Sequence, residues 1–253
     1  DGKDVWPWVG TPNRKGSPSD DTTHYDISKL RQWNTVFEHA QRCGIVLHFV
    51  FNEAEEANKK ELDGGALGDS RKLYYREMIA RFGHNPALEW NLCEEYNLNL
   101  ELEPARIREF ARYVRAIDPY DHPLTVHSAG DPVKALAFTF GDPLFDLTSV
   151  QLNQKRIDQV TERIRAETAR AGRPLPASMD EFTVDKGQKA SHIPVDDVAL
   201  HRKEKLWPTY LSGGMIEFIL EGLLKVGDFK LGQKDALWRT VWNARKFVED
   251  LPF

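Results

Sequence analysis

The chain has 253 residues, of which 41% are hydrophobic and 29% charged, and its formal net charge is −5. This composition excludes a disordered chain, and no apolar run reaches the length of about eighteen residues that a membrane span needs. With 34 basic against 39 acidic residues and no basic block, a nucleic-acid partner is also excluded. Two cysteines do not form a disulfide scaffold.

Helical patterns and apolar runs alternate along the chain. An irregular segment rich in Pro, Gly, Asp and Ser occupies residues 1–21, and a polar loop is expected at 52–69. Apolar spacing predicts helices at residues 26–43, 70–82, 104–117, 133–138, 156–171, 198–211 and 235–250. Apolar runs predict strands at residues 45–51, 87–92, 123–128, 145–152, 175–182 and 215–220.

Strands separated by helices predict parallel pairing, in an open doubly wound sheet or a (β/α)8 barrel. The open sheet predicts a glycine-rich phosphate turn, and neither common form of that motif occurs. We therefore expect an α/β chain that is a (β/α)8 barrel lacking its first two strands. Residues 1–253 would form one catalytic barrel domain, a fragment that begins in the loop after strand 2 and lacks an initiating Met.

Polar side chains follow the apolar part of nearly every predicted strand. In a barrel these positions lie at the catalytic face. The candidates, in chain order, are Asn52, Glu53, Asn91, Glu94, Glu95, His127, Gln151, Glu181 and Glu217. Gathered carboxylates shift one another's pKa values apart, which suits the neutral acid and the ionised carboxylate that glycosidic cleavage requires. For any single acid, a solvated loop position is the alternative.

Two of these strand ends resemble a known enzyme clan. Residues 87–95, which read Ala-Leu-Glu-Trp-Asn-Leu-Cys-Glu-Glu, resemble the fourth strand of clan A glycoside hydrolases. Residues 179–182, Met-Asp-Glu-Phe, resemble the seventh strand of that clan. The longer stretch from residue 62 to residue 92 is similar to a bacterial group of apiosidase-like barrel proteins, some of them named for collagen binding.

The resemblance implies a retaining glycosidase that acts on an oligo- or polysaccharide without a cofactor. Glu181 would be the nucleophile and Glu95 the acid/base, with carboxyl groups roughly 5 Å apart. Glu94 stands where the clan has Asn, so either Glu94 or Glu95 could be the acid. The resemblance also implies a secreted or periplasmic protein, with further β-rich domains in the full-length chain.

Other residues have both a binding and a structural interpretation. Trp6 and Trp8 could stack on a sugar or anchor the opening loop. His127 could bind a sugar hydroxyl or a catalytic glutamate, or be a core histidine, whereas His48, in the middle of a strand, is interpreted as structural. Cys43 and Cys93 are expected at opposite ends of the barrel, and therefore unpaired.

The sequence also bears on alternative kinds of site and function. A metal-dependent barrel hydrolase usually needs closely spaced His ligands, and no H-x-H occurs. The acidic run at 53–58 lacks the spacing of an EF-hand, which favours a solvated run. A serine nucleophile would need a motif such as G-x-S-x-G, which is absent. A barrel that binds carbohydrate without catalysis remains the alternative from another class.

Overall fold

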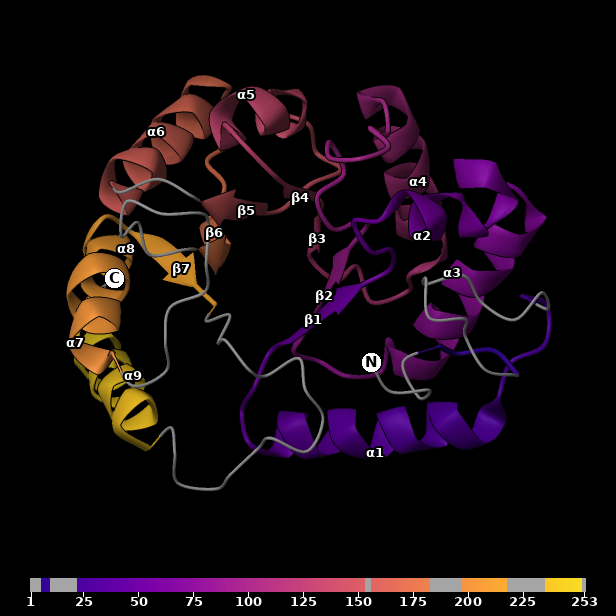
Figure 1. The fold of residues 1–253 in the computed structure, drawn as a ribbon, viewed down its shortest axis with the longest axis horizontal. Helices are drawn as coiled ribbons and strands as arrows, with labels where there is room; N and C mark the ends of the chain where they lie inside the picture. The colour runs from indigo at the N-terminus through magenta and orange to yellow at the C-terminus, as the bar shows by residue number, and fades with distance from the viewer. Residues whose placement is uncertain (1–5, 10–21, 153–155, 183–196, 218–234, 252–253) are drawn as a thin grey trace. The chain divides into compact units, whose positions relative to one another are not determined.

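The computed structural model describes residues 6–9, 22–152, 156–182, 197–217 and 235–251, which group into two compact units (Figure 1). The N-terminal unit comprises Gly2–Ser128 and Asp142–Leu147. The C-terminal unit comprises the described residues of Ala129–Gly141 and of the segment from Thr148 onward. Among the described residues, no helix has the length and apolarity needed to cross a membrane.

The N-terminal unit is built on a parallel sheet in the order β1-β2-β3. Its elements are α1 (Ile27–Arg42), β1 (Leu47–Val50), α2 (Glu56–Glu61), the 3-10 turn η1 (Asp63–Gly65), α3 (Asp69–Phe82), β2 (Leu88–Asn91), α4 (Pro104–Ile117), β3 (Leu124–Thr125) and β4 (His127–Ser128). Helix α1 packs on β1 and α3, and α3 packs on α4.

The C-terminal unit repeats the strand-helix alternation. Strands β5, β6 and β7 pair in parallel in that order, with α6 against β6 and α8 against β7. Its elements are α5 (Pro132–Leu136), η2 (Ala137–Thr139), β5 (Thr148–Leu152), α6 (Ile157–Arg170), β6 (Ala177–Phe182), α7 (Val198–His201), the π-helical turn η3 (Arg202–Leu206), α8 (Trp207–Leu211), β7 (Gly214–Ile216) and α9 (Asp235–Glu249).

Local chemistry explains the boundaries of the predicted helices. The side chain of Asp26 accepts hydrogen bonds from the backbone N–H groups of Ser28 and Lys29, which caps α1. Pro104 occupies the first turn of α4, where its missing N–H costs no helical hydrogen bond. The predicted helices and the parallel strand order are confirmed, with ends that differ by a few residues.

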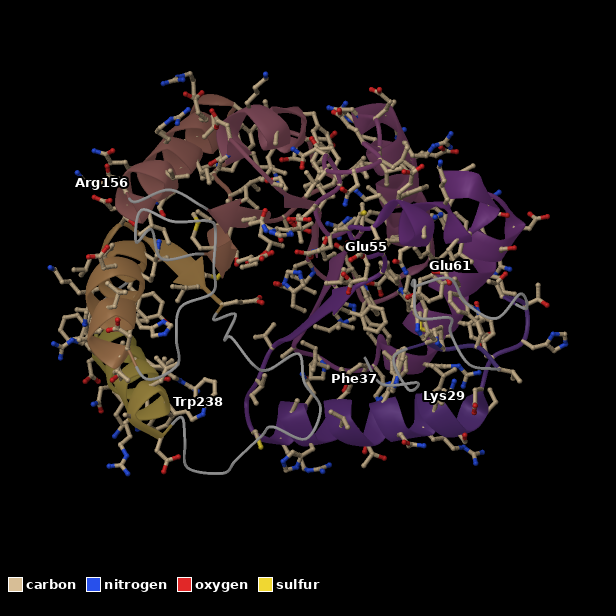
Figure 2. All side chains as sticks on the ribbon, viewed as in Figure 1. Lys29, Phe37, Glu55, Glu61, Arg156 and Trp238 are labelled. Carbon is tan, nitrogen blue, oxygen red and sulfur yellow. The ribbon has the colours of Figure 1, made fainter. Side chains whose placement is uncertain are left out.

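An aromatic core holds the helices of the N-terminal unit on one face of the sheet. Phe37 of α1 points toward the sheet (Figure 2) and meets Phe82 of α3 edge-on, with 5.0 Å between ring centroids. On the same side, Phe49 of β1 lies 5.3 Å from Trp90 of β2. Trp90 is fully buried, and its indole N–H donates to Asp118 over 3.0 Å. The face of β1 and β2 that carries these aromatic side chains therefore packs in the core.

Three segments differ from the prediction. The supposed loop at 52–69 contains α2 and η1, because the buried guanidinium of Arg71 on α3 binds its backbone carbonyls, as described below. The strand predicted at 123–128 divides at Val126, since the backbone N–H of His127 bonds to Cys93 and Asn91. The helix predicted at 198–211 contains a π-helical turn just before Pro208, which has no N–H to donate to the preceding turn. Of the strand predicted at 215–220, residues 218–220 lie outside the described residues.

Candidate active site

The ends of β1 and β2 bring six of the candidate residues into one unit. Asn52 and Glu53 follow β1, Asn91 ends β2, and Glu94 and Glu95 lie in the turn after β2. The backbone N–H of Glu94 donates to the carbonyl of Asn52 over 2.7 Å, which ties the two strand ends together. The sixth, His127, begins β4 and bonds through its backbone to this same turn.

Asn91 lies at the centre of this group and is fully buried. Its side-chain oxygen accepts the backbone N–H groups of Cys93 at 3.1 Å and His127 at 3.2 Å. An amide oxygen that takes two backbone donors leaves the amide nitrogen pointing the other way. That nitrogen lies 3.0 Å from Nε2 of His48 and 3.5 Å from a carboxylate oxygen of Glu94.

The imidazole of His127 contacts both consecutive glutamates. Its Nδ1 forms an ion-pair contact with the carboxylate of Glu94 and lies 3.4 Å from the backbone nitrogen of Glu95. His127 is fully buried, whereas the side chain of Glu94 keeps 24% of its surface exposed. The carboxylate of Glu94 is therefore held between an amide and an imidazole, and it remains accessible from solvent.

Glu95 lies in a turn that a buried lysine stabilises. The φ of Glu95 is +39°, in the left-handed region that side-chain-bearing residues rarely occupy. The ammonium of the fully buried Lys59 donates to the carbonyl oxygens of Glu95 at 2.7 Å and Leu98 at 2.6 Å. Burial lowers the pKa of Lys59, and nearby acidic groups, Cys93 and Glu95 among them, oppose that effect. Strained backbone that its surroundings enforce is typical of functional sites.

Asn52 is part of the hydrogen-bonded support that Arg71 and Lys59 provide. Its side-chain oxygen accepts a hydrogen bond from the guanidinium of Arg71, which is fully buried. The same guanidinium donates to the carbonyls of Lys59 at 3.0 Å and Leu62 at 3.2 Å, and lies 4.8 Å above the ring of Phe110. Arg71 and Lys59 thus hold the segment between β1 and α3, and Asn52 is a part of that support.

Glu53 reaches solvent, but its carboxyl lies among other acids. Packing of protein around that carboxyl raises the pKa of Glu53, and the negative charges of Glu94 and Glu55 raise it further. A raised carboxyl pKa next to a carboxylate is the electrostatic pattern that the sequence predicts for this face.

The two tryptophans of the opening segment differ in exposure. Trp8 is only 3% exposed and packs against Tyr74 and Tyr25, with centroid distances of 5.7 and 6.4 Å. Trp6 stacks on Trp8 at 6.3 Å and is half-buried. Trp8 therefore has the surroundings of an anchor, whereas Trp6 keeps some ring surface exposed.

The remaining candidates belong to the C-terminal unit. Glu181 on β6 pairs in register with Gln151 on β5, after a register shift that leaves Asp180 as an extra residue. Asp180 is buried and accepts the hydroxyl of Ser178, so its carboxylate is already bound. Glu217 is exposed just after β7, and its backbone N–H donates to the carbonyl of Met179 over 2.9 Å.

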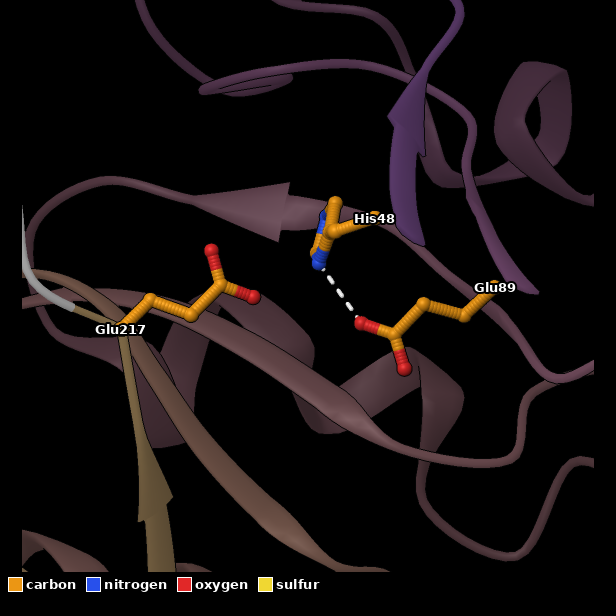
Figure 3. Close-up of side chains that lie close together, drawn as sticks. All are labelled: His48, Glu89 and Glu217. Carbon is orange, nitrogen blue, oxygen red and sulfur yellow. Dashed lines mark ion pairs between the residues drawn. The ribbon is translucent and has the colours of Figure 1, made fainter. Parts of the chain in front are cut away.

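The structure adds two residues that sequence reasoning did not place in the site. His48, interpreted as structural, lies 3.0 Å from the side-chain nitrogen of Asn91, and Glu89, which was not singled out, is paired with His48 (Figure 3). The available signal was polarity at alternate positions of a buried strand, Glu89 and Asn91, next to a histidine in the middle of the preceding strand. The cysteines are both unpaired, as predicted, with Cys43 exposed and Cys93 buried.

The fold is that of the barrels found in glycoside hydrolases. No family model and no curated protein matches the chain. Solved structures do match, and three glycoside hydrolases resemble the chain over 98% of its length.

Three of these structures illustrate the likeness. A glycoside hydrolase aligns with a TM-score of 0.65 at 14% identity, over 98% of this chain and 63% of its own. A family 5 glycoside hydrolase from Bacteroides vulgatus ATCC 8482 gives 0.63 at 15%, over 98% and 61%. A GH5_18 protein from Bifidobacterium longum subsp. infantis gives 0.60 at 12%, over 98% and 69%.

At these identities the likeness shows the fold, and the predicted (β/α)8 architecture is confirmed. The chain spans about three fifths of the length of the first two of these structures.

Proposed function

We propose that this chain carries the catalytic residues of a retaining glycoside hydrolase. The observation that supports this most is the pair Glu94–Glu95 at the end of β2, with the carboxylate of Glu94 held by Asn91 and His127. An acidic pair at a strand end, in a chain with the fold of glycoside hydrolase barrels, suits acid-assisted cleavage of a glycosidic bond.

In the proposed mechanism Glu181 attacks the anomeric carbon, and the bond to the leaving-group oxygen breaks as Glu95 donates its proton to that oxygen. In the second step Glu95 takes a proton from water, the water oxygen bonds to the anomeric carbon, and the carboxylate of Glu181 is released. Glu94, in the place of the clan's Asn, accepts a hydrogen bond from a sugar hydroxyl next to the reacting carbon.

The substrate that we propose is an oligo- or polysaccharide, as the similarity of residues 62–92 to apiosidase-like barrel proteins implies. Trp6 offers partly exposed ring surface for stacking on a sugar. Glu53, Gln151 and Glu217 are the polar groups that would contact its hydroxyls.

Kinetics of three single variants test the proposal. With aryl glycosides as substrates, Glu181→Ala should reduce kcat by at least about 10³-fold, because no covalent intermediate can form. Glu95→Ala should reduce kcat by about 10²–10⁴-fold on poor leaving groups and far less on activated ones, with partial rescue by azide. Glu109→Ala, which removes an exposed acid of α4, is the control and should keep wild-type kinetics.

The same experiment decides between Glu94 and Glu95. If Glu94→Ala shows the leaving-group dependence instead, Glu94 is the acid and the reaction class stands. If Glu94→Ala, Glu95→Ala and Glu181→Ala all keep turnover within about threefold of wild type, the proposed mechanism is wrong. If the wild-type chain binds oligosaccharides but cleaves none of them, the non-catalytic carbohydrate-binding barrel replaces it.

A further inference from the structure

We propose that His48 and Glu89 are a positioning pair that fixes the side chain of Asn91 and, through it, the carboxylate of Glu94. The catalytic consequence rests on the function proposed above, whereas the geometry stands within the N-terminal unit alone. The contacts of the pair run from Glu89 to His48 and from His48 to Asn91, so the pair would act through Asn91.

The register of the sheet builds the pair. His48 on β1 is paired with Glu89 on β2, and side chains of paired residues in a parallel sheet point to the same face. Asn91 lies two residues after Glu89 and so shares that face. The residues between them, Phe49 and Trp90, point to the opposite face and form the aromatic core. One face of these two strands is thus apolar and the other carries a polar row.

Within this polar row, His48 contacts Glu89 through one ring nitrogen and Asn91 through the other. Nδ1 of His48 lies 2.6 Å from a carboxylate oxygen of Glu89 and forms an ion-pair contact with it (Figure 3). Nε2 of His48 lies 3.0 Å from the amide nitrogen of Asn91. The side chains of His48 and Glu89 are only 12% and 13% exposed, so water competes weakly for these contacts.

The backbone N–H groups that bind the side chain of Asn91 determine which nitrogen of His48 carries the proton. The oxygen of Asn91 is held by two backbone N–H donors, so its nitrogen, which can only donate, must face His48. Nε2 of His48 therefore has to be the acceptor and carries no proton. The proton of the neutral imidazole is then on Nδ1, the nitrogen in ion-pair contact with the carboxylate of Glu89.

In this arrangement each residue orients the next, from Glu89 through His48 and Asn91 to Glu94. Glu89 selects the tautomer of His48, the unprotonated Nε2 of His48 receives one N–H of Asn91, and the other N–H of Asn91 is directed at Glu94. Without the acceptor on His48, the amide of Asn91 loses one of the contacts that orient it, and its hold on the carboxylate of Glu94 is weakened, whereas the contact of Glu94 with His127 remains.

The tautomer of His48 can be measured without any substrate. In the full chain labelled with ¹⁵N-histidine at neutral pH, we expect the resonance of His48 to show a protonated Nδ1 and an unprotonated Nε2. The signal is assigned among the eight histidines by its loss in His48→Gln. In Asn91→Asp the facing atom can only accept, so Nε2 of His48 should become protonated. A protonated Nε2 in the wild-type chain, or no response to Asn91→Asp, would overturn the proposal.

Two matched variants test the catalytic consequence. In His48→Gln the longer amide places an acceptor oxygen near the position of Nε2, and kcat should stay within about threefold of wild type. In His48→Asn the shorter amide reaches only the position of Nδ1, and kcat should fall by about 30-fold with KM changed less than threefold. Equal kcat values for the two variants would overturn the positioning role, and thermal unfolding of both would show whether either loses stability.

The two measurements separate this proposal from the proposed function. If the wild-type chain hydrolyses no glycoside but His48 has the expected tautomer, the geometric pair stands and the glycosidase proposal fails. If hydrolysis is observed while the tautomer is the opposite one, the positioning pair fails and the glycosidase proposal stands.

Discussion

At the scale of single residues, Glu95, the proposed acid/base, has an unfavourable backbone conformation. Its φ of +39° is disfavoured for any residue with a Cβ atom, and the hydrogen bonds of Lys59 to the turn maintain it. We expect Glu95→Gly to be more stable than Glu95→Ala by about 1 kcal/mol, because glycine adopts this conformation without strain. Equilibrium denaturation of the two variants measures the difference, which is independent of the lost carboxyl group.

The control for that comparison lies in a regular helix. Glu77 is inside α3, where its φ is helical and its half-buried side chain pairs with Arg81. There the order should reverse, and Glu77→Gly should be less stable than Glu77→Ala by about 1 kcal/mol. The same order at both positions would contradict the assignment of backbone strain to Glu95.

Glu61, the last residue of α2, gives a pH-dependent prediction. Burial raises the pKa of its carboxyl to about 8, against the effects of Asn58 and Arg71. The folded chain thus binds this proton more tightly than the unfolded chain, so this contribution to stability is present at acidic pH and is lost as the pH rises toward 8. Glu61→Gln should therefore be more stable than wild type at pH 8 by roughly 1–3 kcal/mol, with little difference near pH 5.

Thermal unfolding at several pH values measures this effect. Glu56→Gln is the matched control on the same helix, because Glu56 is exposed and pairs only with the exposed Lys60 among the described contacts. A difference between wild type and Glu61→Gln that does not grow with pH would show that Glu61 is ionised in the folded chain at neutral pH.

At the scale of elements, the segment between β1 and α3 depends on one buried side chain. The guanidinium of Arg71 bonds to Asn52 and to the carbonyls of Lys59, Leu62 and Ala66. Arg71→Lys keeps the charge but lacks the planar fork, so several buried carbonyls would lose their donors. We expect it to cost about 2–4 kcal/mol in unfolding free energy, measured by denaturant titration.

A second arginine on α3 provides the control for Arg71. Arg81 pairs with Glu77 one turn away, and both side chains are 32% exposed. Arg81→Lys should change the unfolding free energy by no more than about 0.5 kcal/mol. A similarly small cost for Arg71→Lys would mean that water or a rearranged backbone replaces the lost hydrogen bonds.

Elements also show where prediction from the sequence succeeded and where it did not. Helices such as α1 and α4 were predictable because their apolar period, caps and prolines are all local. Helix α2 was missed because it is short and its backbone is held by Arg71, which lies on another element. The pairing of His48 with Glu89 depends on strand register, which periodicity alone does not supply.

For the candidate site, the positions of the acids along the chain were predictable, but the contacts that hold them were not. Apolar runs that end in acids predicted the positions of Glu94 and Glu95 after β2 and of Glu181 on β6. Which of two consecutive glutamates is held by His127 depends on the conformation of a turn. That turn is determined by Lys59, a contact between segments 36 residues apart in the chain.

At the scale of the whole molecule, the reactivity of the two unpaired cysteines can be used to measure opening of the folded structure. Cys43 is exposed at the end of α1, whereas Cys93 is fully buried and its thiol donates to the carbonyl of Glu94. Burial raises the pKa of Cys93 to about 12, against the effects of Lys59 and Arg71. Since the thiolate is the reactive form, Cys93 should react with a thiol reagent only when the surrounding structure opens.

We therefore expect a thiol-specific chromogenic reagent to modify one cysteine of the native chain rapidly and the second at least about 10³-fold more slowly. In denaturant both should react at similar rates. A Cys43→Ser variant isolates the slow reaction, and its rate should rise further when Arg71→Lys is added, because the weakened segment between β1 and α3 lies next to the turn of Cys93. Rapid modification of Cys93 in the native Cys43→Ser variant would contradict the buried position of this turn, on which the contacts of Asn91, Glu94 and Glu95 depend.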